Sequence, residues 1–304
     1  MSWDRDDLLG KARLFIERAY SHAPDSSLFA FWAVLGLELL ARATLANVHP
    51  ALLADPQQKE NLYYALGHRV PGQVRSIPAK TVYSRCQDLI PLFTESEMEF
   101  CLGLTAVRNA DLHSGEAAFE ALTLGEWQAK YFRVSKVLLE SMGQDLNALF
   151  HPDQMHAIYT MLSVDEEHRK SEVLELVGRA KDAFSKLDAN RQQAALFESE
   201  LAATSPMRSD LFDRCPSCGG FGWLSTEHVS TSDPEIVDDY LSWTVTMLPT
   251  GFTCLSCTLA LPDYAAMEIA GLGGQRTLQE ISDPADYFSL DPLDALMEPE
   301  YQNE

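Results

Sequence analysis

The chain has 304 residues, of which 46% are hydrophobic and 10% aromatic, so it is long enough for two domains and is globular rather than disordered. No apolar run approaches the roughly 18–20 residues that a membrane span needs, because Glu38 and Arg42 interrupt the richest stretch, residues 28–46. The N-terminus lacks the charged and then apolar pattern of a signal peptide, so we expect a cytoplasmic protein with no membrane partner.

The net charge of −22 is concentrated in the second half of the chain. Residues 1–150 contain 14 Lys and Arg against 18 Asp and Glu, a net charge of −4, whereas residues 151–304 contain 9 against 27, a net charge of −18. Nucleic-acid phosphates bind to basic surfaces, so this distribution argues against a broad electrostatic footprint for RNA. Any nucleic-acid chemistry must therefore depend on a local basic pocket in the first half.

The first half has the apolar spacing of an all-α bundle with four or five helices. Ser26 or Ser27 is placed to cap a strongly apolar second helix, and Thr94 with Glu97 resembles a capping box at the start of a later one. Residues 54–79 are polar and rich in turn-forming residues, which predicts a long connection containing a short helix. The longer helices that these signals predict cover residues 6–23, about 26–46, 80–89, about 94–108 and 125–142.

The next segment is also expected to be helical. An apolar stripe in it keeps a 4-3-4-3 spacing and fails at Arg191, which is too short for a coiled coil. We expect this segment to pack on the bundle or on a second subunit. The stripe consists of Val173, Val177, Ala180, Phe184 and Leu187.

Four of the six cysteines form two C-x2-C pairs, Cys215 with Cys218 and Cys254 with Cys257. In a chain without an export signal, such pairs favour a metal site over disulfides or redox chemistry. Each loop presents two thiolates from one tight turn, and two loops complete a closed tetrahedral zinc site. We therefore expect one structural zinc per chain, in a zinc-ribbon-like module whose long gap between the pairs holds a hairpin or loop insertion.

These patterns predict a mainly α fold with an N-terminal α-helical bundle, a helical linker and a small β-rich zinc-ribbon module. The expected boundaries are residues 1–150 for the bundle, 151–210 for the linker, 211–280 for the ribbon module and 281–304 for an acidic tail. In the tail, Tyr287, Phe288 or Leu296 is expected to provide any docking contact.

The most informative stretch for function is Arg108 to His113, at the end of a predicted helix. The stretch combines an arginine with a polar residue, Asn109, directly after it and a histidine five positions on. Arginine and histidine together are enough to cleave RNA without a metal. The ribose 2′-hydroxyl is the nucleophile, the histidine moves the proton, and the guanidinium neutralises charge on the phosphorane. Read alone, the string is a weak signal, because two such residues fall this close in many helices by chance.

With the preceding helices, the stretch resembles the HEPN family of small α-helical domains. Members carry an R-x4–6-H motif with a polar residue after the arginine, and often an acidic residue on the second helix. The matching positions are Arg108, Asn109 and His113, with Glu38 in the acidic position, and the resemblance covers roughly residues 5–145.

The HEPN resemblance implies a metal-independent endoribonuclease that needs no cofactor for catalysis. His113 would be the general acid and base, Arg108 would clamp the phosphate and the transition state, and Asn109 would be an orienting or phosphate-contacting group. The implied substrate is RNA, the implied assembly is a homodimer in which two motifs share one cleft, and the family often serves as a toxin, abortive-infection or antiviral effector.

Helix geometry leaves a structural alternative open. Five positions on an ideal helix turn through about 500°, so Arg108 and His113 lie about 140° apart unless the helix bends or ends, or a second subunit completes the site. The alternative is a helix-end salt bridge of Arg108 with Asp111 and a histidine that caps the last carbonyls, with Glu38 paired to Arg42 at i+4.

A second function class also stays open. An inactive helical dimer and an acidic zinc ribbon would suit a non-catalytic interaction or sensor protein that binds a protein partner. The dimer itself is expected because the second helix is apolar around most of its circumference, more than a small bundle covers alone.

Overall fold

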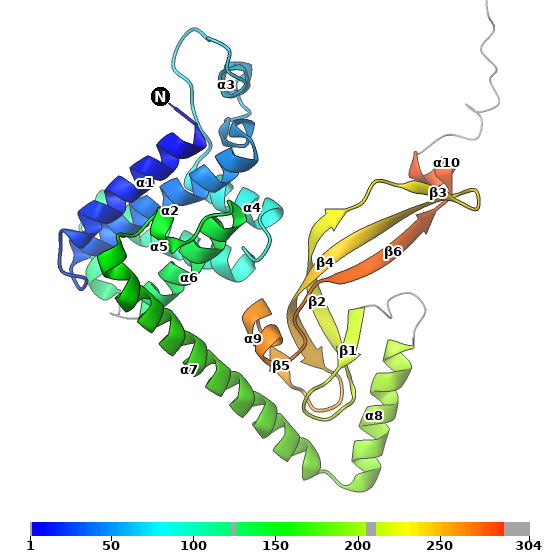
Figure 1. Ribbon diagram of the computed structural model, residues 1–304. Helices are drawn as coiled ribbons and strands as arrows, with labels where there is room; N and C mark the ends of the chain where they lie inside the picture. Colours follow the sequence, from blue (N-terminus) through cyan, green and yellow to red (C-terminus); the bar gives the residue numbers. More distant parts are fainter. Residues whose placement is uncertain (1, 123–125, 205–210, 289–304) are drawn as a thin grey trace, which may run out of the picture. The chain divides into compact units, whose positions relative to one another are not determined.

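The computed structural model describes residues 2–122, 126–204 and 211–288. The chain divides into two compact units, an N-terminal unit of residues 1–172 and a C-terminal unit of residues 173–304 (Figure 1). The N-terminal unit is helical, and the C-terminal unit combines helices with a curled antiparallel sheet. Each unit has its own cluster of buried apolar side chains.

The N-terminal unit is an all-α bundle whose helices begin at local capping signals. The Ser26 hydroxyl accepts a hydrogen bond from the backbone N–H of Phe29, which fixes the start of the second helix. The predicted capping box is confirmed, since the Glu97 carboxylate accepts from both the N–H and the hydroxyl of Thr94. The helices are α1 (Arg5–Tyr20), α2 (Ser27–Val48), α3 (Lys59–Ala65), α4 (Ala79–Leu89), α5 (Glu95–His113) and α6 (Glu126–Ser141), and short 3-10 turns cover Pro50–Leu53, Ala118–Ala121 and Leu146–Ala148.

Helix α2 is the core helix of this bundle, with α1, α4, α5 and α6 packed against it. Among the described helices it alone has the length and composition of a membrane span, but 61% of its apolar window is buried inside the protein, and core helices of soluble proteins meet the same criteria. Its large apolar side chains that remain about half exposed are Leu28 and Val48, at its two ends. Helices of the same chain therefore cover most of α2, so its apolar surface is not by itself evidence for a second subunit.

The C-terminal unit begins within a long helix. Helix α7 (Pro152–Ser185) starts in the N-terminal unit and ends in the C-terminal one, and α8 (Ala189–Ala203) follows it. The sheet comprises β1 (Phe212–Arg214), β2 (Phe221–Thr231), β3 (Glu235–Val237), β4 (Tyr240–Cys254), β5 (Ala260–Leu261) and β6 (Arg276–Ser282), with two short helices, α9 (Tyr264–Ile269) and α10 (Pro284–Tyr287).

Strand β4 organises this sheet, because β2, β3, β5 and β6 all pair with it antiparallel, and β1 pairs with β2. The register of β2 on β4 shifts twice, between Ser225 and Thr226 and between His228 and Ser230. Pro249, which has no N–H to donate, pairs with Thr226 at the first shift. Bulges of this kind increase local twist, and Figure 1 shows β2, β4 and β6 curling together along their length.

The predicted fold class, a mainly α chain ending in a small β-rich zinc-ribbon module, is wrong in the C-terminal part. The residues between the two cysteine pairs form a long hairpin in which β2 and β4 stay paired from Gly222–Cys254 to Thr231–Val245. Strands β1, β3, β5 and β6 then widen it into a six-stranded sheet. β-Branched and aromatic residues continue well past the cysteines, as in Trp243–Thr246, and these support strands longer than a ribbon needs.

The predicted apolar stripe packs on the core of the C-terminal unit, whereas we expected the helical bundle or a second subunit. Val173 and Phe184 are buried in one cluster with Leu224, Phe252 and Met267. Val177 and Ala180 pack against the same cluster, while Leu187 is partly exposed.

The predicted acidic tail begins inside the sheet. Residues 281–282 end β6, and α10 follows with Tyr287 packed against Trp243 at 5.0 Å between ring centroids. Phe288 contacts Tyr287 and is largely exposed. Leu296, with the other residues of 289–304, lies outside the described residues.

Candidate functional site

The two C-x2-C loops form similar turns at one end of the sheet. The first Sγ of each loop accepts a backbone N–H from the residue two positions on, Ser217 to Cys215 at 3.4 Å and Ser256 to Cys254 at 3.3 Å. Four positions after each first cysteine the backbone is left-handed, with φ of +76° at Gly219 and +62° at Thr258. This backbone conformation turns both thiols of a loop toward the same point, which is how such loops hold a metal.

The four cysteine Sγ atoms lie together at metal-binding distance. The Sγ atoms of Cys215 and Cys257 are 3.5 Å apart, those of Cys218 and Cys254 are 3.6 Å apart, and all four lie within 4.8 Å of one another. A tetrahedral ion with metal–sulfur bonds of about 2.3 Å sets its sulfurs about 3.8 Å apart. A disulfide needs about 2.05 Å, and all four cysteines are free. The cluster fits one metal ion, and all four ligand positions come from the chain.

Hydrogen bonds to sulfur determine which thiol loses its proton most readily. The Cys215 thiol and the backbone N–H groups of Cys257 and Ser256 lower the pKa of Cys254 to about 5. Burial raises the pKa of Cys218 to about 12, and the hydrogen bond to Cys254 raises the pKa of Cys215 further. One thiolate is therefore favoured among protonated neighbours, and a cation that binds all four must displace the remaining protons.

Helix α8 packs against the outside of the cysteine cluster and holds it by two hydrogen bonds. Its Ser199 hydroxyl accepts from the N–H of Phe221 at 3.1 Å, and its Ala195 carbonyl accepts from the Ser256 hydroxyl at 3.0 Å. Three of the four cysteines are buried, and Cys218 is half-buried. A closed, buried site of this kind suits a structural role rather than a catalytic one.

Three of the four residues predicted from the HEPN resemblance form one polar network between α2 and α5. The Nη1 atom of Arg108 lies 2.5 Å from Oε2 of Glu38, and its Nε and Nη2 atoms donate to the Asn109 amide oxygen at 3.2 and 3.0 Å. The other oxygen of Glu38 accepts from Arg42 at 2.8 and 3.1 Å. The side chains of Arg42, Glu38 and Arg108 are only 13%, 15% and 15% exposed.

The fourth residue, His113, does not join this network. It is the last residue of α5 and is exposed, and the helix runs without interruption from Arg108 to it. The 140° offset of an ideal helix therefore applies. Within one chain the structure brings together Glu38, Arg108 and Asn109 but not His113.

The two simpler explanations of these arginines fare differently. Arg42 does pair with Glu38 at i+4, as the alternative interpretation predicted. The ion pair of Arg108, however, is with Glu38, 70 positions away, rather than with the neighbouring Asp111. Sequence spacing alone gave no signal for this pairing, because the two residues meet only when α5 packs on α2.

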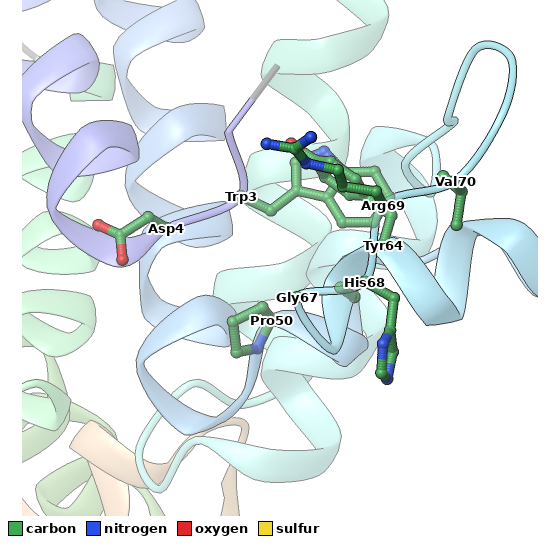
Figure 2. Close-up of a pocket in the computed structure, with 9 residues that line it drawn as sticks. Trp3, Asp4, Pro50, Tyr64, Gly67, His68, Arg69 and Val70 are labelled. Atoms are coloured by element: carbon green, nitrogen blue, oxygen red, sulfur yellow. The ribbon is translucent and has the colours of Figure 1, made fainter.

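Two cavities open near the start of α1, and sequence analysis identified neither. Trp3 lines both of them. One has a volume of about 520 Å³ and lies between the N-terminal segment and the loop after α3 (Figure 2). The other, about 460 Å³, includes Lys11 and Arg42 among its lining residues. Arg108, Asn109 and His113 line neither cavity.

Comparison with protein-family models, with curated proteins and with solved structures found no match to this chain. The HEPN resemblance therefore depends on the residues described above and on the order of the helices.

Proposed function

We propose that the chain is a metal-independent endoribonuclease of the HEPN type that acts as a homodimer, in a toxin, abortive-infection or antiviral role. The observation that carries the proposal is the network of Glu38, Arg108 and Asn109. It sets an oriented, largely buried guanidinium between α2 and α5, five positions before an exposed histidine on the same helix.

Arg108 retains the donors that phosphate recognition needs. A guanidinium has five N–H groups, and Glu38 and Asn109 take three of them. The remaining two are free to bind a phosphate oxygen and to stabilise the charge that develops on phosphorus. Glu38 and Asn109 act by holding the guanidinium in one orientation.

His113 supplies the proton transfer in the proposed reaction. It takes the proton from a ribose 2′-hydroxyl as the 2′-oxygen attacks phosphorus, and the bond from phosphorus to the 5′-oxygen breaks. The proton passes to the leaving 5′-oxygen, which gives a 2′,3′-cyclic phosphate and a 5′-hydroxyl end. Because Arg108 and His113 diverge within one helix, we propose that His113 of one copy serves Arg108 of the other across a two-fold axis.

For the cysteine cluster we propose zinc as the metal. Four thiolates around a closed tetrahedral site match the preference of Zn²⁺, and the site leaves no coordination position for a substrate. The expected content is one zinc per chain with a structural role, so catalysis does not depend on it.

The test is incubation of purified protein with total RNA in EDTA, under conditions in which the fold persists. We expect cleavage that leaves 2′,3′-cyclic or 3′-phosphate ends and is abolished by Arg108→Ala and by His113→Ala. Matched controls are Arg179→Ala and His168→Ala, at exposed positions of α7, and these should cleave like the wild type. Cleavage that survives both site substitutions, or that EDTA removes from folded protein, would contradict the assignment.

A second candidate is a non-catalytic interaction protein, and one observation favours it. The C-terminal half of the chain has a net charge of −18, yet large apolar side chains are exposed at the end of the sheet distant from the cysteines. Ile236 is 79% exposed and Ile281 is 66% exposed. Exposed apolar groups with an acidic surround suit a protein partner better than RNA. Absence of any RNA cleavage by zinc-loaded, dimeric wild type would favour this candidate.

A further inference from the structure

The larger of the two cavities lined by Trp3 is built from segments that are distant in sequence. Its wall combines the N-terminal residues Trp3 and Asp4, Pro50 after α2, and the end of α3 with the loop that follows it, Tyr64 to Val70. Its volume of about 520 Å³ falls within the roughly 300–1,000 Å³ that is usual for small-molecule sites. Figure 2 shows these side chains around the opening.

Local chemistry preforms this cavity. The ring centroids of Trp3 and Tyr64 lie 5.1 Å apart in an edge-to-face arrangement, which fixes the N-terminal segment on α3. Helix α3 then ends in a Schellman motif, in which Gly67 (φ +86°) and His68 donate backbone hydrogen bonds to the carbonyls of Tyr64 and Tyr63. The left-handed glycine turns the chain back so that the next residues line the cavity.

A buried asparagine fixes the rest of the loop. The Asn61 amide donates to the carbonyl of Asp55 and accepts from the N–H of Arg75, at 2.9 and 2.8 Å. Asn61 is fully buried, so these hydrogen bonds join α3 to both neighbouring segments without competition from water. The cavity wall is therefore a defined part of the fold.

The cavity has one cationic end. Arg69 is exposed and has no ion pair among the described residues, and Figure 2 shows its side chain at the same end as Trp3 and Tyr64. The Asp4 carboxylate points away from this end, because it caps α1 by accepting from the N–H groups of Asp6 and Asp7. A free guanidinium beside two aromatic rings is a combination that binds a planar group bearing an anion.

The second cavity lacks a free guanidinium among its lining residues. Its arginine, Arg42, already donates to Glu38, Ser76 and the carbonyl of Ile77. Its lysine, Lys11, shares the opening with the carboxylate of Asp7. Charge and hydrogen-bonding capacity therefore favour the larger cavity as a site for an anionic ligand.

We propose that the larger cavity is a nucleotide-binding site, in which the base packs against the half-buried ring of Tyr64 and the phosphate binds Arg69. Trp3 is only 6% exposed and supports the Tyr64 ring from the core side. An aromatic ring offers a sequence-tolerant surface for a base, and the guanidinium binds phosphate in a bidentate manner. The same chemistry is offered by a free mononucleotide and by the terminal nucleotide of an RNA. The site does not depend on Arg108 or His113, so it stands whether or not the chain cleaves RNA.

Titration calorimetry of the full chain with the four 5′-ribonucleoside monophosphates tests this site. His113→Ala protein is used throughout, so that RNA cleavage does not enter the measurement. We expect saturable binding of at least one mononucleotide, at least tenfold weaker binding to Arg69→Ala, and a similar loss for Tyr64→Leu. Arg75→Ala is the matched control, since it removes another exposed arginine of the same loop that does not line the cavity, and it should bind within twofold of the parent.

Two further arms identify the part of the ligand that is recognised and its source. The matching nucleoside and inorganic phosphate should each bind at least tenfold more weakly than the nucleotide. Tighter binding of a short oligoribonucleotide with a 5′- or 3′-phosphate end would identify an RNA terminus as the source, and equal or weaker binding would identify the free nucleotide.

The proposal is overturned if no mononucleotide or oligoribonucleotide binds at millimolar concentration to folded protein. It is equally overturned if binding is unchanged in both Arg69→Ala and Tyr64→Leu. Circular dichroism of each variant separates loss of binding from loss of fold. Because Tyr64 contacts Trp3, the exposed Arg69 is the variant that stays informative if Tyr64→Leu unfolds.

Discussion

Replacement of Glu38 by alanine is expected to destabilise the N-terminal unit more than replacement of Arg108, the residue assigned to catalysis. Glu38 accepts three hydrogen bonds, two from Arg42 and one from Arg108, and its loss leaves two guanidinium groups without a carboxylate. Loss of Arg108 leaves Glu38 still paired with Arg42. The network is therefore asymmetric.

The magnitudes follow from burial. Removal of one partner from a buried ion pair costs roughly 3–5 kcal/mol. Since the two arginine side chains are 13% and 15% exposed, water still reaches them, and we expect the lower part of that range, about 3–4 kcal/mol, for Glu38→Ala. Arg108→Ala removes one strong charge-assisted hydrogen bond and the exposed contacts to Asn109, which amounts to about 2 kcal/mol.

Urea unfolding followed by tryptophan fluorescence measures this difference. Trp223 and Trp243 lie in the C-terminal unit, so a Trp223→Phe/Trp243→Phe background leaves only tryptophans of the N-terminal unit. Glu17→Ala, at an exposed position of α1, is the control and should stay within about 0.5 kcal/mol of the parent. The reasoning is refuted if Arg108→Ala costs as much as Glu38→Ala, or if both cost less than about 1 kcal/mol. If Arg108→Ala has a modest cost in stability, any loss of RNA cleavage in that variant can be attributed to the proposed chemistry rather than to unfolding.

Three other predictions concern local stability. Cys215→Ser should reduce bound zinc well below one equivalent and unfold the metal end of the C-terminal unit while the helical bundle persists, as metal analysis and circular dichroism would show; a folded, zinc-loaded variant would contradict it. Gly219→Thr should cost roughly 1–2 kcal/mol of stability, because the left-handed backbone at this position strains any side chain, even though no neighbouring atom lies within 4 Å. Thr258→Gly, at the matching left-handed position, should be neutral or stabilise by up to about 1 kcal/mol. Equal shifts in the thermal midpoints of the two variants would refute this argument. Asn61→Ala should cost about 2–4 kcal/mol in urea unfolding, because the carbonyl of Asp55 and the N–H of Arg75 lose their partner, and a cost below 1 kcal/mol would show that water replaces the amide.

The features that sequence predicted well are those that neighbouring residues determine. The cap at Ser26 and the capping box of Thr94 and Glu97 depend on residues three positions apart, and both occur as expected. The cysteine cluster was predictable for a related reason, because the geometry within each C-x2-C loop is determined by neighbouring residues. The approach of one loop to the other depends on the whole fold. It was still predictable, because two thiolates are too few ligands for a tetrahedral metal site and the second C-x2-C loop supplies the other two.

The polar network shows the limit of local reasoning. Spacing identified Arg42 as a partner of Glu38, and that pair exists. A carboxylate has two oxygens, however, and the second oxygen of Glu38 faces Arg108 only because α5 packs on α2. The cavity lined by Trp3, Tyr64 and Arg69 was missed for the same reason, since these residues come from segments that carry no shared motif.

The errors in the C-terminal half have one physical origin. An apolar stripe on a helix indicates that the helix packs against something, but it does not identify the packing partner. The stripe from Val173 to Phe184 was therefore compatible with three partners: the helical bundle, a second subunit, and the core beside the cysteines that it contacts. Strand length is equally non-local, because each residue of β2 is stabilised by its partner on β4 and not by its neighbours in sequence. The cysteines therefore located one end of the sheet correctly, while its extent depended on pairings that span up to 32 residues, from Gly222 to Cys254. Truncation of the hairpin between Ser225 and Gly251, which pair with each other, would then leave the metal end intact, since both C-x2-C loops and their hydrogen bonds to α8 lie outside the deleted residues.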